Sequence, residues 1–379
     1  MIYADNASTT KISESVYVKM LPFLHEQYGN ASNHYSLGSE AKKAIEHSRW
    51  QVAEATGADS SEIVFTSGGS EGNSWILQGI AANSDEQPNH VITSSIEHPS
   101  VMNVCLALEK RGVSVTYLPV DYNGRVSVFD LEAALRHETK AVSIMLVNNE
   151  IGTIQPIAEI GRLLNERGII FHTDAVQAVG HIPVNVVDLH IDLLTASAHK
   201  FNGAKGTGFV YIRSGLSLPQ IVYGGGQEHG MRAGTENVAG IVALGYALEE
   251  SVTDMDNENK KKNFLVQATI DGLRTLVPEV LFIGEDTDRL PGILNIVFPH
   301  ASGEAMMHLL DLKGICVSTG SACNSGKDEP SHTLLSLGLT NKQAKSSIRI
   351  SYGRYNTEED VNSIVSAIID SYNKIIASV

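Results

Sequence analysis

Short apolar runs alternate along this chain with amphipathic segments, and this alternation limits the possible folds more than any other feature. Runs rich in aliphatic or β-branched residues occupy 63–65, 90–92, 113–117, 141–147, 169–172, 193–195 and 208–212. Segments with helical spacing, such as 130–136 and 157–167, lie between most of them. Strands that alternate with helices in this way predict a mainly parallel sheet covered on both faces. We therefore expect an α/β fold.

The pattern changes near residue 255. The segment 254–262 is rich in charge and has no apolar residue after Met255, which indicates an exposed helix or a hinge. Beyond it, we expect strands at 281–283, 293–298, 317–318 and 348–351 among helices at 303–313, 340–347 and 357–377. We predict a large α/β domain over 13–254 and a smaller α+β domain formed by 1–12 together with 255–379.

Charge and cysteine content exclude several classes of protein. A formal net charge of -15 opposes binding to phosphate polyanions, so we expect no direct contact with nucleic acid. The cysteines Cys105, Cys316 and Cys323 are too few and too widely spaced for a disulfide framework. No uncharged apolar stretch approaches the ~20 residues of a membrane helix, and no secretory signal is visible. We expect a cytoplasmic protein that binds no membrane.

The most informative window surrounds Lys200, which follows the apolar run 193–195 and precedes Gly203, Gly206 and Gly208. A lysine just beyond a core strand loses part of its contact with water. Desolvation favours the uncharged amine, the form that Schiff-base chemistry with a carbonyl cofactor needs. The alternative is a solvated lysine in a turn, which is the commoner environment for this residue type.

A glycine-rich turn, Gly68–Ser70, lies between the run 63–65 and an apolar helix that starts near Trp75. Glycines there let backbone N–H groups at a helix N-terminus approach a phosphate, and Ser70 adds a hydroxyl donor. The spacing does not match the dinucleotide fingerprint, and the segment Gly320–Lys327 does not match a P-loop. The turn is therefore either a phosphate site or an ordinary tight turn.

Polar residues also follow three other predicted strands. Asp174 follows the run 169–172, where a carboxylate can keep a pyridine nitrogen protonated, although Asp174 could equally be a helix N-cap. His98 follows the run 90–92, and Asn149 follows the run 141–147. Because the carboxyl ends of parallel strands meet at one edge of a sheet, we predict a single convergent site there.

These motifs, in this order, resemble the cysteine desulfurases of the NifS/IscS type, within the class-V aminotransferase family of pyridoxal phosphate (PLP)-dependent enzymes. The matching motifs cover almost the whole chain: Tyr3–Thr10, Gly29–Asn30 with His34, Phe65–Glu71, Glu97–His98, Asn148–Gly152 with Gln155–Pro156, Asp174–Gln177, Ser197–Lys200, Gly224–Asn237, Ser318–Cys323 and Ile348–Arg354. The resemblance implies the PLP-dependent transferase fold type I, which is the aspartate-aminotransferase-like fold.

The resemblance also implies roles for individual residues. Lys200 would hold PLP covalently and later move the Cα proton of the substrate. Asp174 would pair with the ring nitrogen, Gln177 would contact the ring hydroxyl oxygen, and His98 would stack on the ring and shuttle protons. Asn149 would lie beside the cofactor.

A phosphate site and a substrate site follow from the same resemblance. The residues that would hold the cofactor phosphate are Gly69, Ser70, Ser197 and His199, with Thr235 reaching over from a neighbouring subunit, so a homodimer is expected. Asn149 and Arg349 would bind the substrate carboxylate, and the planar guanidinium of Arg349 suits such an anion. No metal site is expected.

Cys323 would accept the sulfur of L-cysteine, leaving a persulfide and L-alanine. The persulfide would pass to an acceptor protein in iron–sulfur cluster assembly or another thio-modification pathway. Ser318–Cys323 resembles the longer-loop branch of the family rather than the branch that includes selenocysteine lyase-like enzymes. A selenocysteine lyase or an aminotransferase of the same fold remains the alternative. Cys105 and Cys316 lie in apolar segments, and we expect both to be inert core residues.

Overall fold

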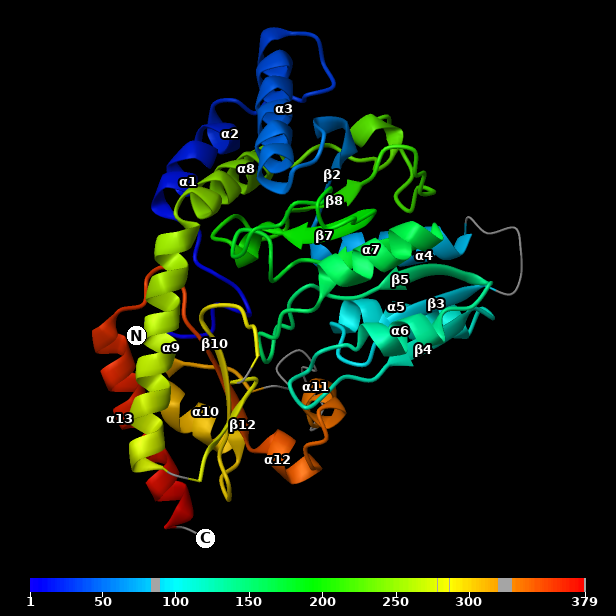
Figure 1. Ribbon diagram of the computed structural model, residues 1–379. Coiled ribbons are helices and arrows are strands. Elements are labelled where there is room, and N and C mark those ends of the chain that lie inside the picture. The colour runs from blue at the N-terminus through cyan, green and yellow to red at the C-terminus, as the bar shows by residue number, and fades with distance from the viewer. Residues whose placement is uncertain (83–88, 278, 286, 320–328, 378–379) are drawn as a thin grey trace.

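The structure, a computed structural model, describes residues 1–82, 89–277, 279–285, 287–319 and 329–377 (Figure 1). A seven-stranded sheet has the order β2-β8-β7-β6-β5-β3-β4. Its strands are β2 (Ile63–Thr66), β3 (His90–Ser94), β4 (Ser114–Leu118), β5 (Thr139–Ser143), β6 (Ile170–Asp174), β7 (Leu193–Ser197) and β8 (Gly208–Ile212). Strand β8 runs antiparallel to β2 and β7, and the other pairings are parallel. The predicted mainly parallel α/β sheet is confirmed.

Helices cover this sheet on both faces. They are α1 (Glu14–Met20), α2 (Pro22–His25), α3 (Ser36–Thr56), α4 (Gly69–Ala82), α5 (Pro99–Glu109), α6 (Val128–Ala134), α7 (Ile157–Arg167) and α8 (Val238–Thr253). Successive strand residues point to opposite faces, and so Val64 packs in a cluster with Trp75 while its neighbour Phe65 packs in the main core. Burial on both faces explains why the strands read as continuous apolar runs rather than as alternating ones.

A smaller unit contains two further sheets. Strand β1 (Ile2–Tyr3) pairs in parallel with β11 (Ile315–Cys316), and an antiparallel sheet has the order β12-β10-β9. These three strands are β12 (Ser347–Ser351), β10 (Ile293–Val297) and β9 (Leu281–Ile283), and the helices are α9 (Met255–Leu276), α10 (Gly303–Asp311), α11 (His332–Ser336), α12 (Asn341–Lys345) and α13 (Glu358–Ile376). The N-terminus lies in this unit (Figure 1). The domain bounds 1–12, 13–254 and 255–379 stay a prediction.

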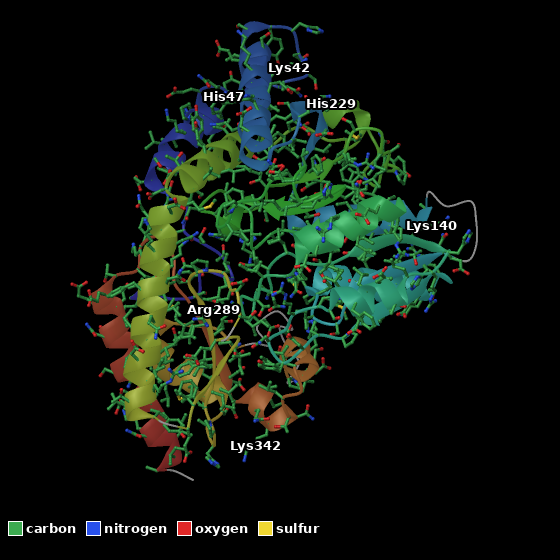
Figure 2. The ribbon with its side chains drawn as sticks, in the orientation of Figure 1. Lys42, His47, Lys140, His229, Arg289 and Lys342 are labelled. Atoms are coloured by element: carbon green, nitrogen blue, oxygen red, sulfur yellow. The ribbon has the colours of Figure 1, made fainter. Side chains whose placement is uncertain are left out.

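The two units meet along several segments. Residues 288–290 run beside 152–154, with an isolated bridge between Thr153 and Arg289, which is labelled in Figure 2. An apolar cluster also joins them, because Leu334 and Leu337 at α11 pack with Ile96 and Met145 of the large unit. None of the described helices is long and apolar enough to cross a membrane.

Several predicted element bounds were wrong. The run 141–147 is not one strand: β5 ends at Ser143, and the buried residues beyond it form a connection toward the site. Apolar periodicity does not distinguish a strand from a buried loop. The pairing strand in the small unit is Ile315–Cys316 rather than 317–318, and α12 ends at Lys345 rather than at residue 347. Cys105 is fully buried as expected, whereas Cys316 is only partly buried.

A buried ion pair joins α3 to the segment before α8. Arg49 Nη1 lies 2.8 Å from Glu228 Oε2, and Nη2 lies 3.0 Å from Oε1. Phe65 N donates to the same carboxylate at 2.7 Å. We predict that Arg49→Met lowers the free energy of unfolding by about 3–5 kcal/mol, because it leaves the Glu228 carboxylate buried without its cation. Denaturant unfolding measures this change.

The matched control is Arg274→Met, which removes a partly exposed pair with Glu285. Its expected cost is below about 1 kcal/mol, because solvent screens such pairs. Equal losses in the two variants would contradict the assignment of the Arg49 pair as a major contributor to stability.

Candidate active site

A cavity of about 380 Å³ lies at the carboxyl ends of the parallel strands, at the side that faces the small unit. It contains most of the residues that the sequence predicted for a site, from both units. The predicted residues that line it are Gly69, Ser70, His98, Asn149, Asp174, Gln177, Ser197, His199, Lys200 and Arg349. The strand ends therefore converge as parallel topology requires.

Two predicted residues remain, and only one of them is described by the structure. Thr235 is exposed on the segment before α8 and does not line the cavity of its own chain. Cys323 lies outside the described residues, and so its place relative to the cavity stays a prediction.

Asp174 ends β6 and is buried, with 5% of its surface exposed. Asn73 Nδ2 donates to Asp174 Oδ2 at 2.7 Å, and Val176 N donates to Oδ1 at 3.0 Å. The second bond is a local turn contact, but no helix begins after Asp174, so the N-cap alternative does not hold. A buried carboxylate held by two neutral donors suits a cationic group in the cavity.

Sequence reasoning missed Asn73. This residue lies one helical turn after Gly69 on α4, and its amide also donates to Ser100 Oγ at 2.9 Å. The i, i+4 spacing from a predicted site glycine is the signal that could have found it, because such residues share a helix face.

His98 is the N-cap residue of α5. Ser100 N donates to His98 Nδ1 at 3.1 Å, which places the proton of the neutral ring on Nε2. Burial lowers the pKa of His98, and the charges of Lys200 and His332 lower it further, whereas Asp174 acts in the opposite direction. The neutral imidazole is therefore favoured near pH 7, and it is able to take up a proton.

Lys200 follows β7 in a short 3₁₀ turn, and its side chain enters the cavity. Its Nζ donates to Ala7 O at 2.6 Å and to Ser8 O at 2.8 Å. Gln177 Nε2 donates to the same Ala7 carbonyl at 2.9 Å. The polar N-terminal segment thus forms one wall of the site, a role that sequence reasoning did not assign to it.

One end of the cavity is suited to an anion. Helix α4 begins at Gly69, and the first N–H groups of a helix have no acceptor within it. A second cavity of about 380 Å³ shares Gly69, Ser70, Ser197 and His199 with the first and adds Lys205. Gly68 has φ +146, and a Cβ there would lie 3.3 Å from Ser197 Oγ, so a side chain would crowd this end. Burial, with Lys200 and Lys205, lowers the pKa of His199 to about 4.

Arg349 reaches the opposite end of the cavity from β12 of the small unit. Its Nη2 donates to Asp5 Oδ1 at 2.7 Å and to Ser8 Oγ at 2.6 Å, and Nη1 donates to Asn149 O at 2.7 Å. The guanidinium is thus already paired with a carboxylate. A substrate carboxylate would share this cation with Asp5, which sequence reasoning also missed.

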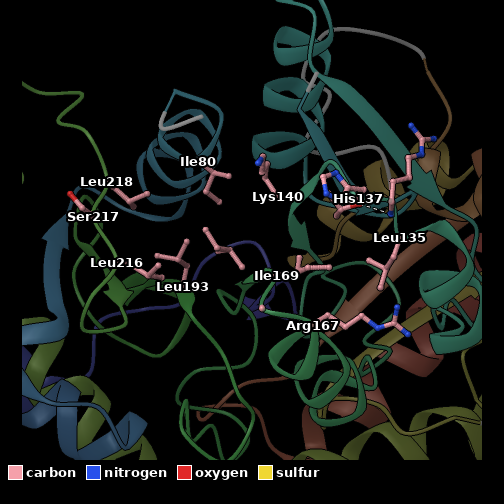
Figure 3. A pocket seen from close by; sticks show the side chains of 14 residues that line it. Ile80, Leu135, His137, Lys140, Arg167, Ile169, Leu193, Leu216, Ser217 and Leu218 are labelled. Atoms are coloured by element: carbon pink, nitrogen blue, oxygen red, sulfur yellow. Dashed lines mark hydrogen bonds between the residues drawn. The ribbon is translucent and has the colours of Figure 1, made fainter. Parts of the chain in front are cut away.

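A larger cavity of about 900 Å³ lies at the opposite edge of the sheet, where β5, β6 and β7 begin (Figure 3). Aliphatic side chains such as Leu193 and Leu216 line it together with basic ones. Of the latter, Arg136 donates to Ser114 Oγ and Arg167 is paired with Glu132. It contains none of the predicted site residues, so its size does not identify it as an active site.

Comparison with known proteins agrees with this geometry. The family model for aminotransferase class-V matches residues 2–364. Cysteine desulfurase IscS of Clostridium botulinum is 47% identical over 369 residues, which are 97% of this chain and 93% of that protein. Cysteine desulfurase IscS of Methanosarcina thermophila is 46% identical over 374 residues, which are 99% of this chain and 92% of that protein.

Solved structures show the same relationship. A NifS-like protein superposes with a TM-score of 0.93 at 36% identity, covering 98% of this chain and 99% of its own. The structure of SspA in complex with cysteine gives a TM-score of 0.83 at 35% identity, covering 94% of this chain and 100% of its own. The chain therefore belongs to the class-V aminotransferase family, and within it to the cysteine desulfurases of the NifS/IscS type.

Proposed function

We propose that this protein is a PLP-dependent cysteine desulfurase, which converts L-cysteine to L-alanine and passes the sulfur through Cys323 to an acceptor protein. The observation that carries the proposal is the convergence of Lys200, Asp174, His98 and Arg349 on one cavity. An amine, a buried carboxylate, a neutral imidazole and a guanidinium are the groups that amino-acid chemistry with a carbonyl cofactor needs.

The residues present fit PLP in three respects. The N-terminus of α4 with Ser197 and His199 suits a phosphate, and Asp174 suits a protonated ring nitrogen. Lys200 supplies the amine that would bind the aldehyde carbon, after exchanging its bonds to Ala7 O and Ser8 O. When bound, PLP supplies an electron sink for bonds that break at the substrate Cα.

The side chains of this chain then have distinct tasks. Arg349 and Asn149 orient the substrate carboxylate, and Lys200 moves the proton at the substrate Cα. The neutral ring of His98 accepts a proton beside the substrate. The thiolate of Cys323 attacks the sulfur of the substrate, so that an S–S bond forms while the C–S bond breaks. L-Cysteine and the Cys323 thiol thereby become L-alanine and a Cys323 persulfide, with no other oxidant or reductant.

A substrate panel tests this function. The purified protein should release L-alanine and persulfide-bound sulfur in equal amounts from L-cysteine. L-Selenocysteine and an amino acid/keto acid pair are supplied in parallel. Formation of a keto acid without sulfur release would instead show an aminotransferase, and turnover restricted to L-selenocysteine would show a selenocysteine lyase.

We further propose that the working form is a homodimer in the cytoplasm. Thr235 is exposed and does not line its own cavity, and Tyr223 on the preceding segment is 81% exposed, which supports contact with a second copy. The net charge of -15 favours an acceptor protein with a basic docking face. Sedimentation equilibrium tests the dimer, and Thr235→Ala should weaken PLP binding without preventing assembly.

A further inference from the structure

Helix α11 of the small unit lies against the two connections that carry His98 and Asn149. Polar contacts at its first residues supplement the apolar packing of Leu334 and Leu337. Sequence reasoning assigned no role to α11. The contacts of α11 therefore link the small unit to the site. The family resemblance did not predict these contacts.

The first contact involves the peptide that joins Glu97 to His98. His332 Nε2 donates to Glu97 O at 2.9 Å. The side chain of Glu97 is held as well, because Ser94 Oγ and Met145 N donate to Oε1 at 2.6 and 2.9 Å. Glu97 is fully buried, and burial raises its pKa to about 8. Both ends of this residue are thus fixed directly before His98.

The second contact involves the residue after Asn149. Ser331 Oγ donates to Glu150 Oε2 at 2.5 Å and also accepts the N-cap bond from Leu334 N. Asn148 ties the two connections together, because its Nδ2 donates to Ile96 O at 3.0 Å and its Oδ1 accepts from Glu150 N at 2.9 Å. Hydrogen bonds therefore join the connection before His98 to the connection around Asn149, and α11 is bonded to both.

We propose that His332 is a positioning residue for His98: its hydrogen bond to Glu97 O holds the peptide from which the His98 ring projects into the cavity. The kinetic part of this inference rests on the proposed function. His98 is bonded at Nδ1 to Ser100 alone among the described residues, so the direction of its ring depends on the backbone that carries it.

Charge provides a second link between the two histidines. The charged groups that act on His98 are Asp174 from β6, Lys200 after β7 and His332 from α11. The charge of His332, like that of Lys200, lowers the pKa of His98. Removal of the His332 ring should therefore raise the pKa of His98 toward its ordinary value.

Three variants separate the hydrogen bond from the charge. His332→Leu removes both, His332→Gln keeps an amide donor at similar reach but no charge, and Ser336→Ala removes another α11 bond, to Ser95 O at 3.3 Å. We expect His332→Leu to lower kcat about tenfold with KM within about twofold of the parent, which is the size of one lost hydrogen bond. His332→Gln and Ser336→Ala should stay within about threefold of the parent.

The second readout does not depend on activity. With labelled histidine, the NMR titration of the His98 Cε1 proton, identified with His98→Gln, should move to higher pH in both His332 variants and not in Ser336→Ala. Unchanged kcat and unchanged His98 titration in His332→Leu would overturn the proposal. Equal rate losses in all three variants would also overturn it, because they would reflect loosening of α11. A parent without desulfurase activity would refute the proposed function, while the titration would still show whether the charge of His332 acts on His98.

Discussion

Replacement of Lys200 by alanine is expected to abolish turnover of L-cysteine, with a loss on the order of 10⁴-fold or more. Lys200 is the amine of the site cavity, where its Nζ contacts the carbonyls of Ala7 and Ser8. Its removal takes away both the covalent hold on PLP and the base at the substrate Cα. These two losses occur at successive steps, and Lys200 is the only lysine among the described residues that line the cavity.

Single-turnover formation of L-alanine measures this loss. Treatment with borohydride should attach PLP permanently to the parent protein and not to Lys200→Ala. The control is Lys110→Ala, which changes an exposed lysine at the end of α5 and should leave turnover within about twofold of the parent. Borohydride-stable attachment of PLP to Lys200→Ala would show that another lysine binds the cofactor.

Cys323→Ala is expected to abolish persulfide formation while PLP absorption and binding of L-cysteine persist. The sulfur of the substrate needs a thiolate acceptor, because the C–S bond breaks only as the new S–S bond forms. Cys323 lies outside the described residues, so this expectation rests on the resemblance of Ser318–Cys323 and on the proposed function. Trapping of the persulfide with a labelled alkylating agent measures the outcome.

The other two cysteines provide matched controls. Cys105 is fully buried, and burial raises the pKa of its thiol to about 12, so it is not a thiolate near neutral pH. Cys316 lies on β11 and pairs with Tyr3 through the backbone. Cys105→Ala and Cys316→Ala should therefore keep full persulfide formation. Sulfur release by Cys323→Ala at the parent rate would contradict the proposed acceptor.

Strand ends explain why much of the site was predictable. Asp174 and Ser197 end β6 and β7, and His98 follows β3 after a short turn. In a parallel sheet such residues meet at one edge whatever the rest of the molecule does. Strand bounds were less predictable, since the apolar residues 144–147 are buried in a connection rather than in β5.

Contacts between distant parts of the chain were not predictable in this way. Asp5 pairs with Arg349, and His332 donates to Glu97 O, across hundreds of residues in each case. Neither pair leaves a periodic pattern, because hydrogen bonds between loops depend on how the two units pack. Cys316 shows the same limit: its apolar surroundings predicted burial, but β11 leaves it partly exposed.

The sequence by itself determined the α/β class, the convergence of polar strand ends and the family, because periodicity and local motifs are properties of short segments. Only the tertiary structure decided that the N-terminal segment lines the site, that Asp5 is paired with Arg349, and that α11 supports the backbone before His98. These features depend on the relative placement of segments far apart in the chain. That placement is set by the packing of buried surfaces and by the pairing of buried polar groups, which no single segment specifies.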